Sequence, residues 1–336
     1  MKRLALIFLV ACGTDEPPLS DATSLQCPSP GNLPFRVSSG FRHSTNANLA
    51  KMDTRVKHWG ADTIGVPSGA SANVLAADTA TPGTEAPEFD GTMGVTASNG
   101  GLFSQPMTDE YVSVWTYDGS DWQMLGRGLT DEDGLYNIAG ATVPNDQPAF
   151  AVLEANGTCA EQFDHLFPTG EKVVVTDIDG TLTTADSELG MEINDPTYEP
   201  LMMGHADALT QAWAMKGYPI IYLTNRPHVL RPETRSWLAE KMFPPGPVIT
   251  SNGTASDASA YKTIWLQRMV QTFGWQIVAA YGNASTDISA YANAGIPKTQ
   301  TFIVGPLAGS DSTQPIDNMD YAQHIQTYVD AQPNNN

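Results

Sequence analysis

The chain has 336 residues, of which 41% are hydrophobic, and this is enough for one large or two ordinary domains with true cores. Its formal net charge of −20 argues against nucleic-acid binding and against adhesion through an overall basic surface. We therefore expect no nucleic-acid partner, and the sequence predicts no protein partner.

The N-terminus has the composition of an export signal. Two basic residues precede a short apolar run within residues 2–11, too short to span a bilayer stably. Residues 9–12 resemble a bacterial lipoprotein signal, in which Cys12 is acylated and becomes the mature N-terminus. The alternative is an ordinary secretory signal with a chance cysteine. Gly13 replaces the aspartate associated with inner-membrane retention, so we expect an exported, lipid-anchored protein, with the outer membrane preferred.

Residues 13–33 are polar and rich in turn-forming residues, and they are predicted to form a tether between the lipid and the folded body. With Cys12 lipidated, Cys27 and Cys159 remain, and an even number of cysteines in an exported protein fits one disulfide. We predict a bridge between Cys27 and Cys159. Two unrelated buried thiols are the alternative.

Residues 34–160 are predicted to form a small antiparallel β-sandwich. Short alternating strands separated by turns run through 111–117, 122–125, 135–138 and 148–153. No catalytic grouping occurs among them, so we expect this domain to serve in packing or presentation.

Residues 165–330 are predicted to form an α/β domain with a parallel sheet, because strands alternate with helices. The predicted strands and helices, in chain order, are 173–175, 206–216, 219–223, 231–241, 258–273, 277–281, 286–294 and 301–304. The tail from 333 to 336 is expected to be disordered.

Two aspartates follow the first of these strands. In an extended chain Asp177 and Asp179 point the same way, Ile178 points into the core, and Gly180 lets the backbone turn sharply. Close carboxylates repel unless one is protonated or a cation lies between them, and Mg²⁺ suits such a site. One aspartate could then attack phosphorus while the other transfers the proton. The alternative is an Asp that only caps a turn.

Later strands also end in residues capable of this chemistry. Thr224 and Asn225 could hold a phosphoryl oxygen, and Lys262 could neutralise phosphate. Asn283 and Asp287 would share a face at a helix start, where Asp287 could supply a further metal ligand. The predicted metal ligands are Asp177, Asp179, Asn283 and Asp287. Taken singly, each has an ordinary explanation as a turn, a solvated lysine or a helix cap. Their order along the chain favours a common site.

This order resembles the haloacid-dehalogenase-like phosphatases, and most of all the lipin-type catalytic domain, over roughly residues 165–305. The motifs that carry the resemblance are 177–183 and 217–227, continued by 234–238, 246–248, 261–262 and 281–297. The strands from 110 to 134 are similar to the segment preceding the same domain in membrane-associated phosphatidylinositol transfer proteins. The resemblance implies a Rossmann-like parallel sheet of haloacid-dehalogenase type.

The resemblance also implies Mg²⁺-dependent hydrolysis of phosphatidate to diacylglycerol. Asp177 would be nucleophile and metal ligand, and Asp179 the general acid/base. Thr224 and Lys262 would hold phosphate, and Asp287 would complete the metal site. In the transfer proteins the domain resembles a phosphatidate binder without the nucleophile, so a non-catalytic sensor is one alternative. A phosphatase of soluble phosphomonoesters is another.

The spacing of the motifs leaves no room for a cap domain, and an open site suits a large or membrane-embedded substrate. The segment 226–243 carries Arg226, Arg231, Arg235 and Lys241 among aromatic residues. One interpretation is that it faces the headgroups of anionic phospholipids such as phosphatidate in a membrane. The other is an ordinary helix with Trp237 in the core.

Overall fold

The structure is a computed structural model. It describes residues 40–47, 63–65, 73–75, 108–117, 121–132, 136, 148–155, 159–195, 197–227, 230–251 and 258–335.

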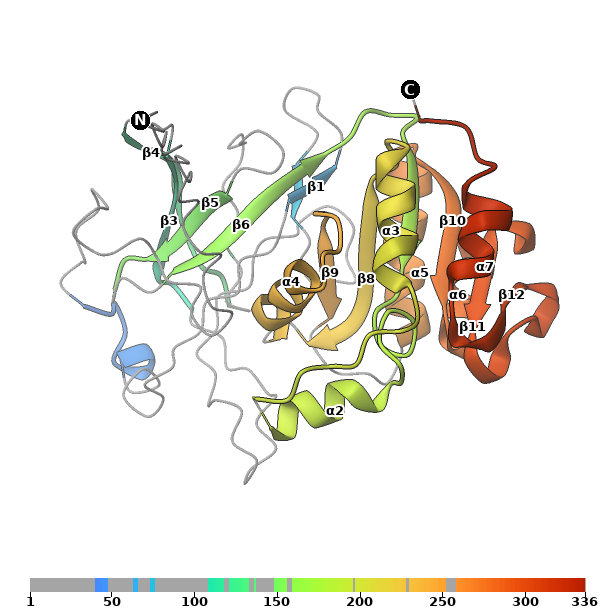
Figure 1. The fold of residues 1–336 in the computed structure, drawn as a ribbon. Coiled ribbons are helices and arrows are strands. Elements are labelled where there is room, and N and C mark those ends of the chain that lie inside the picture. Colours follow the sequence, from blue (N-terminus) through green and yellow to red (C-terminus); the bar gives the residue numbers. More distant parts are fainter. Residues whose placement is uncertain are drawn as a thin grey trace, which may run out of the picture.

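The C-terminal part is built on a six-stranded parallel sheet in the order β12-β11-β10-β7-β8-β9 (Figure 1). Its strands are β7 (Lys172–Thr176), β8 (Ile220–Pro227), β9 (Val248–Ser251), β10 (Gln276–Gly282), β11 (Thr301–Val304) and β12 (Gln314–Ile316). The predicted parallel sheet is confirmed. Since β7 is central and the strands are parallel, the segments that follow β7, β8 and β10 meet at one edge of the sheet.

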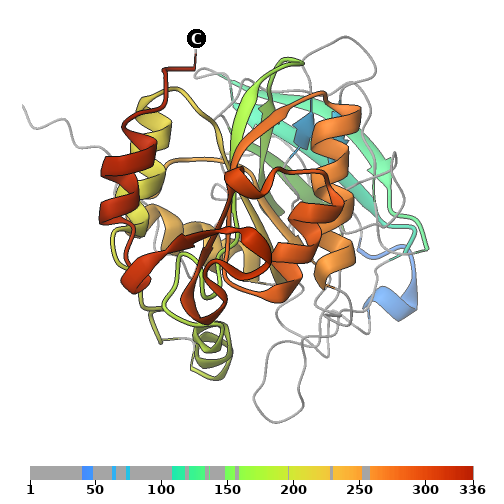
Figure 2. The same ribbon diagram turned by 90° about the vertical axis from the view of Figure 1, so that its right-hand side faces the viewer.

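Helices cover both faces of this sheet (Figure 2). The helices of this part are α2 (Ser187–Asn194), α3 (Ala206–Met215), α4 (Arg231–Glu240), α5 (Ala258–Gln267), α6 (Ser285–Asn293) and α7 (Ala322–His324), and α2 lies beyond the carboxyl ends of the strands (Figure 1). Side chains alternate along β7, so Val174 joins the core under α3, whereas Val173 and Val175 join the core under α5 and α6. Both faces of β7 are therefore buried, which explains its uninterrupted apolar sequence.

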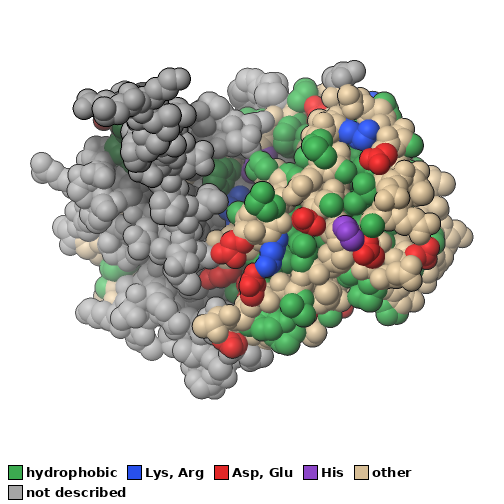
Figure 3. All heavy atoms as spheres, viewed as in Figure 1, with side chains coloured by type: hydrophobic (Ala, Val, Ile, Leu, Met, Phe, Trp, Pro, Cys, Tyr) green, Lys and Arg blue, Asp and Glu red, His purple; other side chains and the backbone are tan. Residues whose placement is uncertain are grey.

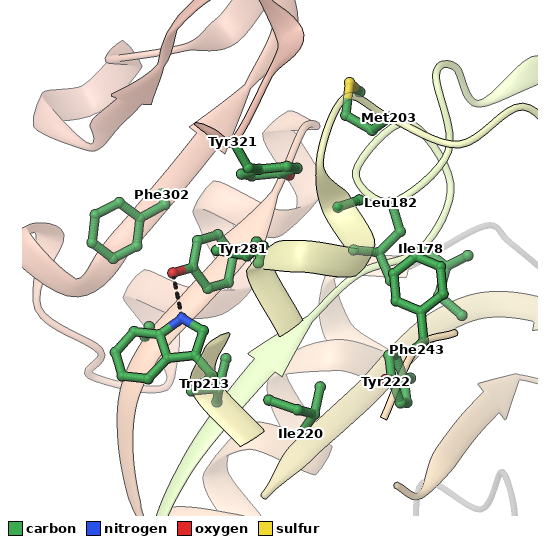
Figure 4. Packing of buried hydrophobic residues seen from close by; sticks show 14 of the residues in the cluster. Ile178, Leu182, Met203, Trp213, Ile220, Tyr222, Phe243, Tyr281, Phe302 and Tyr321 are labelled. Carbon is green, nitrogen blue, oxygen red and sulfur yellow. Dashed lines mark hydrogen bonds between the residues drawn. The ribbon is translucent and has the colours of Figure 1, made fainter. Parts of the chain in front are cut away.

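The core on the α3 side also supports the loop after β7 (Figure 4). Ile178 and Leu182 are fully buried in it. The indole N–H of Trp213 donates a 2.8 Å hydrogen bond to the Tyr281 hydroxyl, and the Tyr321 hydroxyl donates to the carbonyl oxygen of Thr181 at 3.0 Å. The chain beyond β11 thus holds the loop in which the two aspartates lie.

The N-terminal strands form one further sheet, in the order β2-β1-β6-β5-β3-β4. The strands are β1 (Thr63–Gly65), β2 (Asn73–Leu75), β3 (Tyr111–Tyr117), β4 (Trp122–Leu129), β5 (Pro148–Leu153) and β6 (Cys159–Leu166). The β-sandwich predicted for 34–160 is therefore corrected to a single, largely antiparallel sheet among the described residues. The reason is that β1 pairs with the free edge of β6, in parallel, and extends that sheet.

Several elements were not predicted, namely β1, β2 and β6 of the N-terminal sheet and β9, β12, α2 and α7 of the C-terminal part. The tail was predicted wrongly, because it is held against the sheet. The Asn335 amide donates to the Glu171 carboxylate at 2.5 Å and to the Lys172 carbonyl at 3.1 Å, and the Tyr218 hydroxyl donates to the Pro333 carbonyl at 3.0 Å. A run of asparagines gives no apolar signal, so such polar contacts are invisible in the sequence.

The segment around α4 does not form the basic surface considered above. Arg231 is buried and donates to the Thr250 hydroxyl, and Trp237 lies in the core. Arg235 lies over the ring of Phe163 on β6, and Lys241 pairs with Glu199. On the face shown in Figure 3, Lys and Arg side chains lie beside acidic ones. The alternative of an ordinary packed helix is the better description.

Among the described residues, no helix is both long and apolar enough to cross a bilayer. Cys12 and Cys27 lie outside those residues, so lipidation and the disulfide with Cys159 stay predictions.

Candidate active site

The two aspartates lie where β7 ends. The amide of Asp177 still donates to the Tyr281 carbonyl of β10 at 3.0 Å, and the chain then turns through Gly180, which has a φ of +70°. A Cβ added to Gly180 would lie 2.1 Å from the side-chain nitrogen of Asn283. Glycine is therefore required here for its backbone conformation and for the close approach of the β10 loop.

Lys262 lies between two carboxylates. Its ammonium nitrogen is 2.6 Å from Asp177 Oδ1 and 2.7 Å from Asp287 Oδ1, and all three side chains are buried. Lys262 comes from α5, Asp177 from the end of β7 and Asp287 from α6. The structure therefore brings together three residues that are distant in sequence and were predicted to belong to one site.

Burial has the largest effect on the pKa of Asp177. It raises the pKa of Asp177 to about 7, with the Lys262 cation opposing the shift and the Asp287 carboxylate adding to it. Burial alone would lower the pKa of Lys262, but the two carboxylates raise it above its usual value. Lys262 is therefore fully charged at neutral pH.

Asp287 also begins α6. Its Oδ2 accepts the backbone N–H groups of Asn283 and Ala284 at 3.1 and 3.0 Å, which places a negative charge at the helix N-terminus. Gly282 allows this contact, because a Cβ there would lie 2.5 Å from the Cβ of Asp287. The helix-capping explanation for Asp287 is thus confirmed, and its role as a metal ligand stays a prediction.

Thr224 and Asn225 lie just past the register pair Thr176–Tyr222, at the same edge as the two aspartates. The Thr224 side chain is fully buried, and its hydroxyl accepts the backbone N–H of Arg226 at 3.2 Å. The Asn225 carbonyl accepts the hydroxyl of Ser251 at 3.0 Å. The end of β8 is therefore an irregular but hydrogen-bonded stretch of strand beside the site. Phosphate binding by these residues stays a prediction.

Asp179 has a partner that was not assigned from the sequence. Arg226 Nε lies 3.0 Å from Asp179 Oδ2, and Arg226 Nη2 lies 2.9 Å from Asp179 Oδ1. On its other edge, Arg226 Nη1 donates to Glu192 of α2 and to the Thr234 hydroxyl, each at 3.0 Å. Burial opposes the charge of Arg226, but these carboxylates raise its pKa.

Only some of the predicted magnesium ligands lie close together. The described residues contain no group of three or more His, Cys, Asp or Glu side chains arranged to hold a metal ion. In the structure both carboxylate oxygens of Asp179 accept N–H groups of Arg226, and its role as a metal ligand stays a prediction. Asp177 Oδ2 and Asn283 Oδ1 lie 3.5 and 3.3 Å from the hydroxyl of Thr181, which sits between them.

The donors that remain still fit Mg²⁺. This ion is typically held by one or two carboxylates and completes its shell with water and phosphate oxygens. The number of charged groups also favours a bound cation, because four carboxylates lie beside only two cations. The carboxylates are those of Asp177, Asp179, Glu192 and Asp287, and the cations are Lys262 and Arg226. When these carboxylates are ionised, a further cation would favour the entry of an anionic phosphate. Asp177 and Asn283, with Asp287 behind them, would hold the ion.

Sequence reasoning missed Thr181, Asp186 and Glu192. Asp186 accepts the side-chain N–H of Asn283 at 2.8 Å and so helps to fix that residue. No pattern marks either acid, since α2 was itself not predicted. Arg226 was noticed only as a basic residue within the second motif.

The fold and site are those of an α/β protein with an acidic centre at the carboxyl edge of a parallel sheet. Comparison with known proteins gives a more particular result: residues 174–305 match the family described as PITM 1-3, LNS2 domain. Mouse membrane-associated phosphatidylinositol transfer protein 3 is 34% identical over 200 residues, which are 57% of this chain and 19% of that protein. Drosophila melanogaster protein retinal degeneration B is 30% identical over 213 residues, 61% of this chain and 16% of that protein. The chain thus spans about a fifth or less of these relatives.

Two solved structures are also similar. A HAD-like phosphatase from Mesorhizobium loti is 16% identical with a TM-score of 0.33, covering 45% of this chain and 82% of that one. An apo phosphoserine phosphatase is 13% identical with a TM-score of 0.33, covering 47% and 98%.

Proposed function

We propose that this protein is a Mg²⁺-dependent phosphatidate phosphatase, which hydrolyses phosphatidate to diacylglycerol and inorganic phosphate. One observation carries the proposal. Two aspartates lie at the carboxyl edge of the central strand, and each is held by its own buried cation, Asp177 by Lys262 and Asp179 by Arg226. An aspartate that only caps a turn needs no buried cation beside it. A nucleophile and a proton-transfer group, in contrast, need separate environments that set their pKa values apart.

In the first step a carboxylate oxygen of Asp177 attacks phosphorus, and the bond between phosphorus and the glycerol oxygen breaks. Asp179 gives its proton to the departing oxygen, so diacylglycerol leaves as a neutral alcohol. The product on the enzyme is an aspartyl-phosphate at Asp177. Lys262 remains beside Asp177 and offsets negative charge in the reacting group.

In the second step Asp179, now a carboxylate, takes a proton from water while the water oxygen attacks phosphorus. The acyl-phosphate bond breaks, phosphate leaves, and both aspartates return to their starting forms. Bound Mg²⁺ would supply positive charge that neutralises the phosphate oxygens and favours the ionised form of Asp177.

The lipid substrate is supported by two observations. The curated relatives are named as phosphatidylinositol transfer proteins, and those names concern a phospholipid. In addition, the segment between β7 and β8 contains α2 and α3, and its described residues form no separate folded cap over the site. We further propose that Cys12 anchors the chain to a membrane through the tether 13–33. Phosphatidate in that membrane is the proposed partner.

The test is phosphate release from phosphatidate in vesicles, compared with a short soluble phosphomonoester, with Mg²⁺ and with chelator. We expect release from vesicles that needs Mg²⁺ and is lost in Asp177→Asn. The matched control is Asp311→Asn, the same change at an exposed aspartate that pairs with Lys298, and it should keep full activity. Equal or faster turnover of the soluble ester would favour a phosphatase of soluble substrates.

A second candidate is a non-catalytic phosphatidate sensor, favoured by the match to the LNS2 domain of transfer proteins. Its signature would be binding to phosphatidate vesicles without phosphate release. That result in the wild-type chain with Mg²⁺ present would contradict the enzymatic proposal.

A further inference from the structure

All three guanidinium nitrogens of Arg226 donate hydrogen bonds to other side chains. Nε and Nη2 bind the two oxygens of Asp179, and Nη1 binds Glu192 and Thr234. The side chain of Arg226 has no exposed surface, while that of Asp179 is 14% exposed. Arg226 is thus the fully buried partner of the pair, and Asp179 is the partner that keeps some exposed surface.

A planar guanidinium that meets a carboxylate through two parallel bonds fixes its orientation as well as its charge. Asp179 lies in the turn after β7 and precedes Gly180, so its local backbone gives little restraint on the side chain. Arg226 is itself fixed from β8, with Thr234 of α4 and Glu192 of α2 as its other partners. The position of Asp179 is thus determined by three separate elements of the fold.

We propose that Arg226 is a positioning residue, which holds the Asp179 carboxyl where it exchanges a proton with the substrate oxygen. The inference rests on the proposed function, since it concerns the proton-transfer step of that reaction. It also assigns a role to α2, because Glu192 fixes the far edge of the same guanidinium. Arg226 does not touch the substrate in this arrangement and acts through Asp179.

If Arg226 positions Asp179, the effect of losing Arg226 depends on the leaving group of the substrate. An alkyl phosphate, such as phosphatidate or glycerol phosphate, needs protonation of the departing oxygen, whereas p-nitrophenyl phosphate departs as a stable phenolate without it. General acid catalysis contributes roughly 10²- to 10⁴-fold. A mispositioned Asp179 should therefore lower turnover of alkyl phosphates about 100-fold, with much less effect on the aryl phosphate.

The experiment measures kcat/KM of the full chain for glycerol phosphate and p-nitrophenyl phosphate, with Mg²⁺. Arg226→Lys keeps the charge but loses the two parallel bonds, and Asp179→Asn removes the proton-transfer group. We expect both variants to raise the aryl-to-alkyl ratio about 100-fold. In the double variant the Arg226→Lys change should cost nothing further on either substrate, because residues that act as a unit are not additive.

The matched control is Arg231→Lys, which changes another buried arginine, one that binds the Thr250 hydroxyl. It should leave the ratio unchanged. If Arg226→Lys does not fold, Arg226→Gln with Glu192→Gln removes the buried charges together and is measured instead.

Equal loss on both substrates, or additive losses in the double variant, would overturn the positioning role and leave the proposed function standing. A wild-type chain that hydrolyses neither phosphate ester nor phosphatidate would overturn both.

Discussion

Replacing Asp177 with asparagine tests whether the buried, ionised carboxylate of Asp177 lowers the free energy of unfolding at neutral pH. The pKa of Asp177 rises from 3.8 to about 7 on folding, chiefly through burial. A raised pKa means that the native state binds this proton more tightly than the unfolded state. The stabilisation from Asp177 is therefore fully present below about pH 4 and is lost as the pH rises through about 7.

The size of this effect follows from the same shift. At about 1.4 kcal/mol per pH unit, a rise from 3.8 to about 7 corresponds to about 4 kcal/mol as an upper bound. Asparagine has the shape of the neutral acid and does not ionise. We therefore expect Asp177→Asn to raise the free energy of unfolding at pH 8 by about 2–4 kcal/mol, although it abolishes activity.

The assay is urea unfolding followed by tryptophan fluorescence at pH 4, 6 and 8, with chelator so that no metal stabilises the carboxylate. The wild type should lose stability between pH 4 and 8, and Asp177→Asn should lose much less. The control Asp311→Asn should follow the wild type. A variant less stable than wild type at pH 8, or parallel pH profiles, would refute the electrostatic reasoning.

Three further outcomes are expected. Lys262→Met leaves Asp177 and Asp287 buried without their cation, so the free energy of unfolding should fall by about 3–5 kcal/mol at pH 8. The loss should be smaller at pH 5, where Asp177 is protonated. An equal loss at both pH values would contradict this reasoning. Gly180→Ala forces a positive φ on alanine and a clash with Asn283, and should cost about 1–3 kcal/mol and most activity, measured by unfolding and phosphate release. Adding Mg²⁺ should raise the melting temperature of the wild type and not that of Asp177→Asn; equal shifts would show that the ion binds elsewhere.

The parallel sheet could be predicted because its central strands are buried on both faces. Val173 to Val175 and Ile220 to Leu223 are apolar runs that allow no other placement once helices alternate with them. The edge strands β9 and β12 have only four and three residues, which is too short for any periodicity. Their place is set by pairing with neighbouring strands, which local sequence does not record.

The site was predictable to the extent that strand ends determine it. The order of Asp177, Lys262 and Asp287 along the chain led to a cluster that the structure confirms as a contact. The partner of Asp179 was not predictable, because Arg226 lies 47 residues away and its role depends on side-chain direction. Arg231 shows the same limit: its charge suggested a surface, but a hydroxyl on β9 lets it be buried.

The most direct test of the central claim is to look for the covalent intermediate. The wild-type chain is mixed with phosphatidate labelled in the phosphate group and Mg²⁺, quenched in acid within milliseconds, and digested for mass spectrometry. We predict a phosphoryl group on Asp177 that hydroxylamine removes and that is absent in Asp177→Asn. Phosphate release from the wild type with no label on Asp177, or label on a different residue, would contradict the account.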